Sequence, residues 1–130
     1  MSKRVQVALL LTGNELMSGD TVDSNSSRIA LALGAHKIGV GKKITVGDDP
    51  TLLTDSLIDL CASAEVVIIN GGLGPTEDDL TAELVAEVAG QALVNHPSAI
   101  EHLQEWCERR GLELNASNLK QALLPEGANL

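Results

Sequence analysis

Two stretches of the chain are almost continuously apolar. They run from Val5 to Leu11 and from Val66 to Ile69, and both are rich in Val, Leu and Ile. A strand with one solvated face carries apolar residues at every second position, whereas a strand of a parallel sheet covered by helices on both faces is apolar throughout. The pattern therefore predicts that both stretches are central, parallel strands.

A third stretch alternates instead. Val40, Ile44 and Val46 face one way, and more polar residues lie between them. Because successive side chains of a strand point to opposite faces, this strand is expected to be half solvated and nearer an edge of the same sheet.

Apolar residues recur at helical spacing between and after these strands. Asp49 followed by Pro50 is typical of a helix start, and a glycine just after an apolar run is typical of a helix end. The predicted helices run from about Ser24 to Leu33 with an end at Gly34, from Pro50 with Leu53, Leu57, Leu60 and Cys61 on one face, through Leu80, Leu84 and Val88 with an end at Gly90, and from Pro97 to about Arg110 with Ile100, Leu103 and Cys107 inward.

Strands and helices thus alternate along 130 residues. That order predicts an α/β fold with a parallel sheet and right-handed crossovers, and the length predicts one domain over residues 1–130. In such a fold, ligands bind outside the carboxyl ends of the strands. The loops expected there are "TGNELMSGD", "VGDDP" and "NGGLGPTEDD".

Charge and composition narrow the partners and the compartment. The net charge is −9 and Trp106 is the only aromatic residue, so neither a basic groove nor a stacking platform for nucleic acid is expected. The longest apolar runs are too short to cross a bilayer, so no membrane partner is expected and the protein is predicted to be soluble and cytoplasmic. Cys61 and Cys107 are predicted to be buried thiols. The three histidines have no metal-ligand spacing, and they are expected to be surface or helix residues.

The three loops combine glycines with acids. Glycine lets backbone N–H groups approach a phosphate, yet carboxylates beside it repel the same anion. Mg²⁺ or a similar divalent ion, held by one or two carboxylates and by phosphate oxygens, turns this repulsion into attraction. Two alternatives stay open, because the acids can be solvated or helix-start residues and the glycine loop can be a tight turn without a ligand.

Four ordered motifs carry a resemblance to a known family. "TGNELMSGDTVDSNSSRIALAL", "TVGDDPTLL", "INGGLGPTEDDLTAELVAEVAG" and "ASNLKQALLPEGA" resemble the amino-terminal domain of the CinA-type competence/damage-inducible proteins, in the molybdopterin-binding superfamily of MoaB and MogA. The resemblance covers nearly the whole chain. It implies a three-layer α/β/α sandwich with a mostly parallel central sheet, and it implies homodimers or homotrimers.

The same resemblance implies a function. For the CinA-type branch it implies metal-dependent hydrolysis of ADP-ribose at the pyrophosphate, and for the cofactor-synthesis branch it implies binding of molybdopterin. Leu73 is the CinA-type choice where molybdopterin proteins usually have threonine. The alternative is a non-catalytic pterin- or nucleotide-binding module. Two features favour it: Leu119 stands in place of the usual arginine, and the family pattern continues past "PEGANL". The domain is therefore expected to be truncated at its carboxyl end.

The resemblance also implies the site residues. Asp48 and Asp79 correspond to the two aspartates of the MogA-type site, and they are expected to bind a divalent ion (Mg, Mn or Co) or to activate water, with Asp78 as a further metal ligand. If they share a metal, the pair without metal should raise the pKa of one of its members. The residues expected to bind the ligand are Thr12, Gly13, Glu15, Asn25, Asn70, Gly71, Gly72, Gly74, Pro75, Thr76, Lys120 and Gln121.

Overall fold

The computed structural model describes residues 4–130. The chain divides into two compact units, one formed by the residues up to Gly71 and one by Gly72–Leu130. The sequence predicted a single domain over residues 1–130. That the two units act as one domain stays a prediction.

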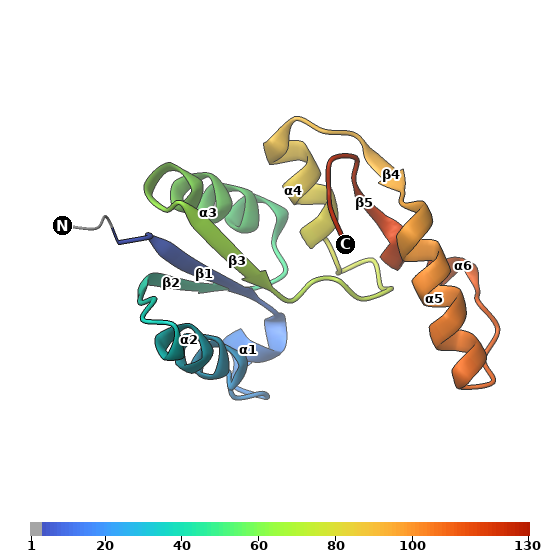
Figure 1. The fold of residues 1–130 in the computed structure, drawn as a ribbon, viewed down its shortest axis with the longest axis horizontal. Helices are drawn as coiled ribbons and strands as arrows, with labels where there is room; N and C mark the ends of the chain where they lie inside the picture. Colours follow the sequence, from blue (N-terminus) through green and yellow to red (C-terminus); the bar gives the residue numbers. More distant parts are fainter. Residues whose placement is uncertain (1–3) are drawn as a thin grey trace. The chain divides into compact units, whose positions relative to one another are not determined.

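The first unit is built on a three-stranded parallel sheet (Figure 1). Its strand order is β2-β1-β3, and each outer strand pairs in parallel with β1. In chain order, the elements are β1 (Val7–Thr12), α1 (Asn14–Ser18), α2 (Asn25–Ala35), β2 (Val40–Val46), α3 (Pro50–Ser63) and β3 (Val66–Asn70).

β1 is the central strand and every residue in it is buried. Leu9, Leu10 and Leu11 are each 1% exposed, and burial of one such side chain contributes about 1.5–3 kcal/mol. The prediction of a central parallel strand is therefore confirmed for β1, and the edge position of β2 is confirmed as well. It is wrong for β3, which pairs only with β1 in the described sheet. A continuous apolar run indicates that both faces of a strand are buried, but it does not indicate whether both edges of the strand are hydrogen-bonded to neighbouring strands.

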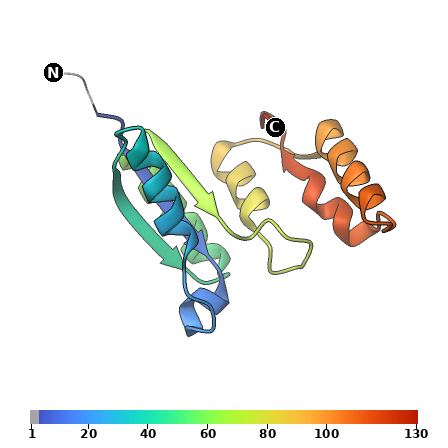
Figure 2. The same cartoon turned by 60° about the horizontal axis from the view of Figure 1, so that its bottom comes forward.

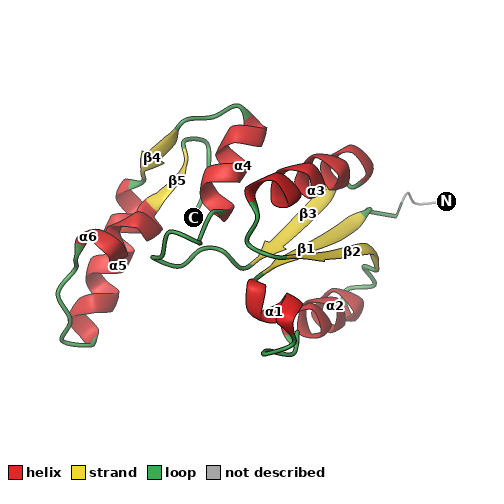
Figure 3. Cartoon of the chain, turned by 180° about the vertical axis from the view of Figure 1, so that it is seen from behind, coloured by secondary structure: helices red, strands yellow, loops and turns green. Residues whose placement is uncertain are grey.

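Helices cover both faces of this sheet. α3 lies on one face, and α1 and α2 lie on the other (Figures 2 and 3). Neighbouring residues of β2 reach the two layers in turn, because the Lys42 ammonium contacts Asp59 of α3 at 3.2 Å and the Lys43 ammonium contacts Ser26 of α2 at 3.2 Å. The three-layer α/β/α arrangement with a parallel sheet is confirmed.

The predicted helix starts are more accurate than the predicted helix ends. The Asp49 carboxylate accepts a hydrogen bond from the Leu52 N–H at 2.9 Å, as expected for the residue that caps α3. Leu60 is buried, but Cys61 is exposed, so the predicted burial of this thiol is wrong. One further residue rotates a side chain by about 100° around the helix axis, away from the core. The first long helix likewise passes through Gly34, its predicted end.

The second unit combines helices with a short antiparallel strand pair. Its elements are α4 (Thr81–Ala89), β4 (Leu93–Asn95), α5 (Pro97–Arg109), α6 (Ala116–Leu119), the 3₁₀ helix η1 (Lys120–Ala122) and β5 (Leu123–Pro125). Gly90 ends α4 with a φ of 66°, and Cys107 of α5 is buried, both as predicted. Strands of three residues carry too little periodicity to be recognised, and β4 and β5 were not predicted. None of the described helices is long and apolar enough to span a bilayer.

Candidate functional site

In the first unit, Asp48 ties the ends of two strands together. Its carboxylate accepts hydrogen bonds from the Thr12 hydroxyl at 3.1 Å and from the Asn14 N–H at 3.2 Å. The Asp48 N–H donates in return to the Asn14 side-chain oxygen at 2.9 Å. Thr12 ends β1 and Asp48 follows β2, so this network fixes the carboxyl edge of the sheet at the position that the sequence predicted for a site.

Gly71 follows the end of β3 and lies against the end of β1. It has a φ of 110°, and a Cβ added to it would lie 2.3 Å from the Thr12 carbonyl oxygen. Side chains rarely adopt this φ, and a backbone oxygen in a paired strand has little room to move. Glycine is therefore required here by both the backbone conformation and the packing.

A pair of amides completes this edge. Asn25 at the start of α2 donates to the Asn70 side-chain oxygen at 3.0 Å. The following residue, Ser26, is 3% exposed, donates its hydroxyl to Asp23 and accepts from the Lys43 ammonium. The hydrogen bonds from the Ser26 side chain and backbone hold the pKa of Asp23 below its usual value despite partial burial. This network fixes the start of α2 and with it the position of Asn25.

In the second unit, Asp79 organises the loop that follows the glycines. Its carboxylate accepts from the Thr76 N–H at 2.9 Å and from the Thr76 hydroxyl at 2.7 Å. Burial raises the pKa of Asp79, but the hydrogen bonds from Thr76 and Gly74, with the charge of Lys120, outweigh it and hold this pKa below its ordinary value. The pKa of Asp79 is lowered because these donors stabilise its charged form. The sequence predicted that one member of the pair has a raised pKa if Asp48 and Asp79 share a metal, and this stays a prediction.

Lys120 holds the same loop from the other side. Its ammonium donates to the Thr76 carbonyl, and it donates to the Asp79 carbonyl at 2.8 Å. An ammonium has three N–H donors, so one donor is left over after these two contacts. Gln121, the next residue, reaches the Leu73 carbonyl at 3.5 Å. The residues of η1 thus contact the glycine loop, although more than 40 positions separate them in the chain.

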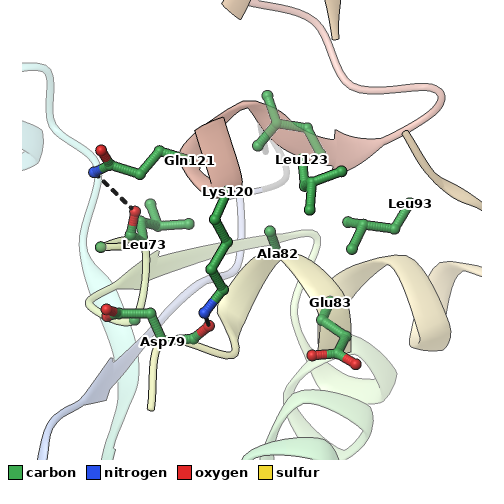
Figure 4. Close-up of a pocket in the computed structure, with 11 residues that line it drawn as sticks. Leu73, Asp79, Ala82, Glu83, Leu93, Lys120, Gln121 and Leu123 are labelled. Carbon is green, nitrogen blue, oxygen red and sulfur yellow. Dashed lines mark hydrogen bonds between the residues drawn. The ribbon is translucent and has the colours of Figure 1, made fainter. Parts of the chain in front are cut away.

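These residues surround a cavity of about 260 Å³ within the second unit (Figure 4). One part of its wall is polar, with Asp79, Glu83, Lys120 and Gln121 beside the glycine loop. The other part is apolar and comes from Leu73, Ala82, Leu93, Leu123 and Leu124. The cavity therefore offers both charged and apolar groups to one ligand.

The predicted site residues fall into two groups. Thr12, Gly13, Asn25, Asp48, Asn70 and Gly71 gather at the sheet edge of the first unit, and Gly72, Gly74, Asp79, Lys120 and Gln121 line the cavity of the second. Glu15, Pro75, Thr76 and Asp78 are exposed, and Pro75, Thr76 and Asp78 do not line that cavity. The sequence analysis did not name Asn14 as a site residue, although its place in the first glycine-containing loop could have indicated it. It also did not name Glu83 or the leucines of the apolar wall, and no pattern in the sequence marks these residues.

The divalent ion that the sequence predicted would have few protein ligands. Among the described residues, no three His, Cys, Asp or Glu side chains gather as a metal site. Mg²⁺ commonly takes one or two carboxylates and completes its shell with phosphate oxygens and water, so isolated aspartates in glycine loops agree with this chemistry. Asp48 belongs to the first unit and Asp79 to the second. That they share one ion stays a prediction.

Comparison with known proteins gives consistent matches along the chain. Residues 8–124 match the protein family described as "Probable molybdopterin binding domain". A CinA-like protein of Colwellia psychrerythraea is 50% identical over 125 residues, which is 96% of this chain and 29% of that protein. The chain thus spans less than a third of the length of this curated relative.

Solved structures agree with these sequence matches. The crystal structure of the protein CinA from Thermoplasma acidophilum superimposes with a TM-score of 0.82 at 30% identity, covering 96% of this chain and 73% of that one. The molybdopterin biosynthesis enzyme MoaB from Thermus thermophilus gives a TM-score of 0.62 at 19% identity, covering 92% of this chain and 70% of that one. The second likeness concerns the fold alone.

Proposed function

This chain belongs to the molybdopterin-binding domain family and, within it, to the CinA-like proteins, and from that premise we propose that it is a metal-dependent pyrophosphatase acting on ADP-ribose or a similar nucleotide. The observation that carries the proposal is the cavity of the second unit. There a glycine loop, an aspartate with a lowered pKa and an ammonium line one space. These are the groups that a phosphate with its accompanying cation requires.

Each group has a distinct task in this reaction. Gly72 and Gly74 let the backbone approach phosphate oxygens without side chains between them. Lys120 keeps the loop in shape through the Thr76 and Asp79 carbonyls, and its remaining N–H is available to a phosphate oxygen. Asp79 stays ionised at neutral pH and serves as the metal ligand. A bound divalent ion would polarise the phosphoryl group and lower the pKa of the attacking water.

The reaction splits one phosphoanhydride bond. The oxygen of water joins one phosphorus, the bridging oxygen leaves with the other, and the products from ADP-ribose are AMP and ribose 5-phosphate. Asp48, which holds the Thr12 and Asn14 ends of its sheet edge, is the second acid on which we expect turnover to depend.

The direct test is incubation with ADP-ribose and Mg²⁺, Mn²⁺ or Co²⁺, followed by separation of AMP and ribose 5-phosphate. We expect product formation that a chelator abolishes. Asp79→Asn should lower it by at least about 10-fold, because loss of even an outer partner of a metal ligand typically costs about 10- to 100-fold. Asp55→Asn, which changes an exposed acid on α3, is the matched control and should retain full activity. Product formation that survives both the chelator and Asp79→Asn would refute the proposal.

A second candidate, a non-catalytic molybdopterin- or nucleotide-binding module, is favoured by one observation. The carboxylates of Asp48 and Asp79 already accept hydrogen bonds from their own loops, which gives both acids a structural role without any metal. Calorimetry decides between the two functions. Tight binding of ADP-ribose or molybdopterin, with no product formed in the presence of Mg²⁺, Mn²⁺ or Co²⁺, would support the binding module.

A further inference from the structure

A second cavity lies in the second unit and shares Gln121 with the first. It measures about 330 Å³ and is lined by His102, Leu103, Trp106, Asn118 and Gln121. A cavity of this volume has room for one ring system. Gln121 also lines the cavity that contains the glycine loop. The two cavities therefore have a side chain in common.

Trp106 is the most informative residue of this second cavity. It is the only aromatic residue of the chain, and it is 40% exposed, whereas Cys107 beside it on α5 is 2% exposed. Because Trp106 also lines the cavity, part of its indole is accessible to a ligand there. Its ring is also held in place, since the Arg110 guanidinium lies over it at 4.2 Å from the ring centre.

The polar groups of the cavity suit the edge of a nitrogen heterocycle. Asn118 and Gln121 each carry an amide with donors and an acceptor, and such groups pair with the ring nitrogens and amino groups of a base. The Gln121 amide also donates one N–H to the Leu73 carbonyl at 3.5 Å, which leaves its second N–H and its oxygen for a base. Both come from the short "SNLKQ" stretch, whose Lys120 contacts the glycine loop. One segment thus contributes polar groups to an anion-binding loop and to an aromatic cavity. A nucleotide has those two parts, a phosphate and a base.

We propose that the cavity lined by Trp106, Asn118 and Gln121 binds the adenine base of the nucleotide, with the ring against the indole and the two amides on its edge. The assignment rests on the proposed function for the identity of the ligand as a nucleotide. The base binding itself depends only on the cavity, the indole and the amides. Stacking on an aromatic side chain is strong enough to matter, since its loss typically weakens binding by roughly 5- to 100-fold.

The single tryptophan provides a direct measurement. With no Tyr and one Trp in the chain, the protein's intrinsic fluorescence comes from Trp106 alone. The intact protein is titrated with AMP, with ribose 5-phosphate and with a pterin, under excitation that adenine does not absorb. We expect saturable quenching by AMP and none by ribose 5-phosphate. No quenching by AMP, or quenching by the pterin alone, would overturn the assignment to adenine.

Variants separate this inference from the proposed function. Trp106→Leu and Asn118→Ala should each raise KM for ADP-ribose with little change in kcat, and Trp106→Phe, which keeps an aromatic ring, should restore most of the affinity. Ile58→Ala, at a 53% exposed position of α3, is the matched control. Hydrolysis with an unchanged KM in Trp106→Leu defeats the inference and leaves the pyrophosphatase standing. Quenching by AMP without any hydrolysis supports the inference while the pyrophosphatase fails.

Discussion

The substitution Gly71→Ala tests how the first unit closes its site edge. The added methyl would lie 2.3 Å from the Thr12 carbonyl oxygen, and the φ of 110° would be kept by a residue with a side chain. An unfavourable backbone conformation costs about 1–3 kcal/mol, and overpacking against atoms that cannot retreat costs about 1–3 kcal/mol more. We therefore expect Gly71→Ala to lower the free energy of unfolding by about 2–6 kcal/mol.

The assay is urea unfolding followed by far-ultraviolet circular dichroism, with comparison of the midpoints and slopes. Two glycines of the same unit serve as controls, since neither has an atom within 4 Å of its added Cβ. Gly19→Ala keeps a φ of 84° without a clash, so about 1–2 kcal/mol is expected. Gly34→Ala lies within α2 and should stabilise by about 0.5–1 kcal/mol. If Gly71→Ala costs no more than Gly19→Ala, the close contact with Thr12 does not exist in solution.

Three further predictions concern a helix cap, an acid and assembly. Asp49→Ala should lower the free energy of unfolding by about 1 kcal/mol in urea, because the Leu52 N–H loses its acceptor. The pKa of Asp79 is lowered in the folded state, so its contribution to stability is present above the unfolded pKa and is lost as the pH falls through the folded pKa. From pH 5 downwards, the free energy of unfolding should therefore fall less steeply in Asp79→Asn than in the unchanged protein. Sedimentation should show a species heavier than 13.6 kDa at micromolar concentration, given Val22 and Leu31 at 83% and 73% exposure, and a monomer alone would contradict it.

Much of the fold was predictable because its signals are local. The apolar run of β1 and the Asp49 cap each depend on a few consecutive residues, and both are confirmed. The end of α2 was misplaced because Gly34 is compatible with a helix interior, and Lys37, with a φ of 60°, follows the actual end. The edge position of β3 depends on which strands pair with it, and no pattern within the strand contains that information.

The candidate site was predictable at the level of loops but not of contacts. Parallel strands bring their carboxyl ends to one edge, so the approach of Thr12 to Asp48 followed from topology. The contact of Lys120 with the Asp79 carbonyl joins residues 41 positions apart, and only folding of the second unit brings them together. The lowered pKa of Asp79 depends on Thr76, three positions earlier, whose two donors favour the charged carboxylate.

The structural and chemical roles of Asp79 can be separated through its partner. Asp79→Asn removes the charge and weakens the loop at once, because the same carboxylate oxygen accepts from the Thr76 N–H and from the Thr76 hydroxyl. Thr76→Val removes only the hydroxyl donor and leaves the carboxylate in place. If Asp79 acts as a metal ligand, Thr76→Val should lose stability with little loss of turnover, whereas Asp79→Asn should lose turnover beyond any loss of stability. Equal losses of turnover in both variants, in proportion to their loss of stability, would mean that Asp79 only shapes the loop.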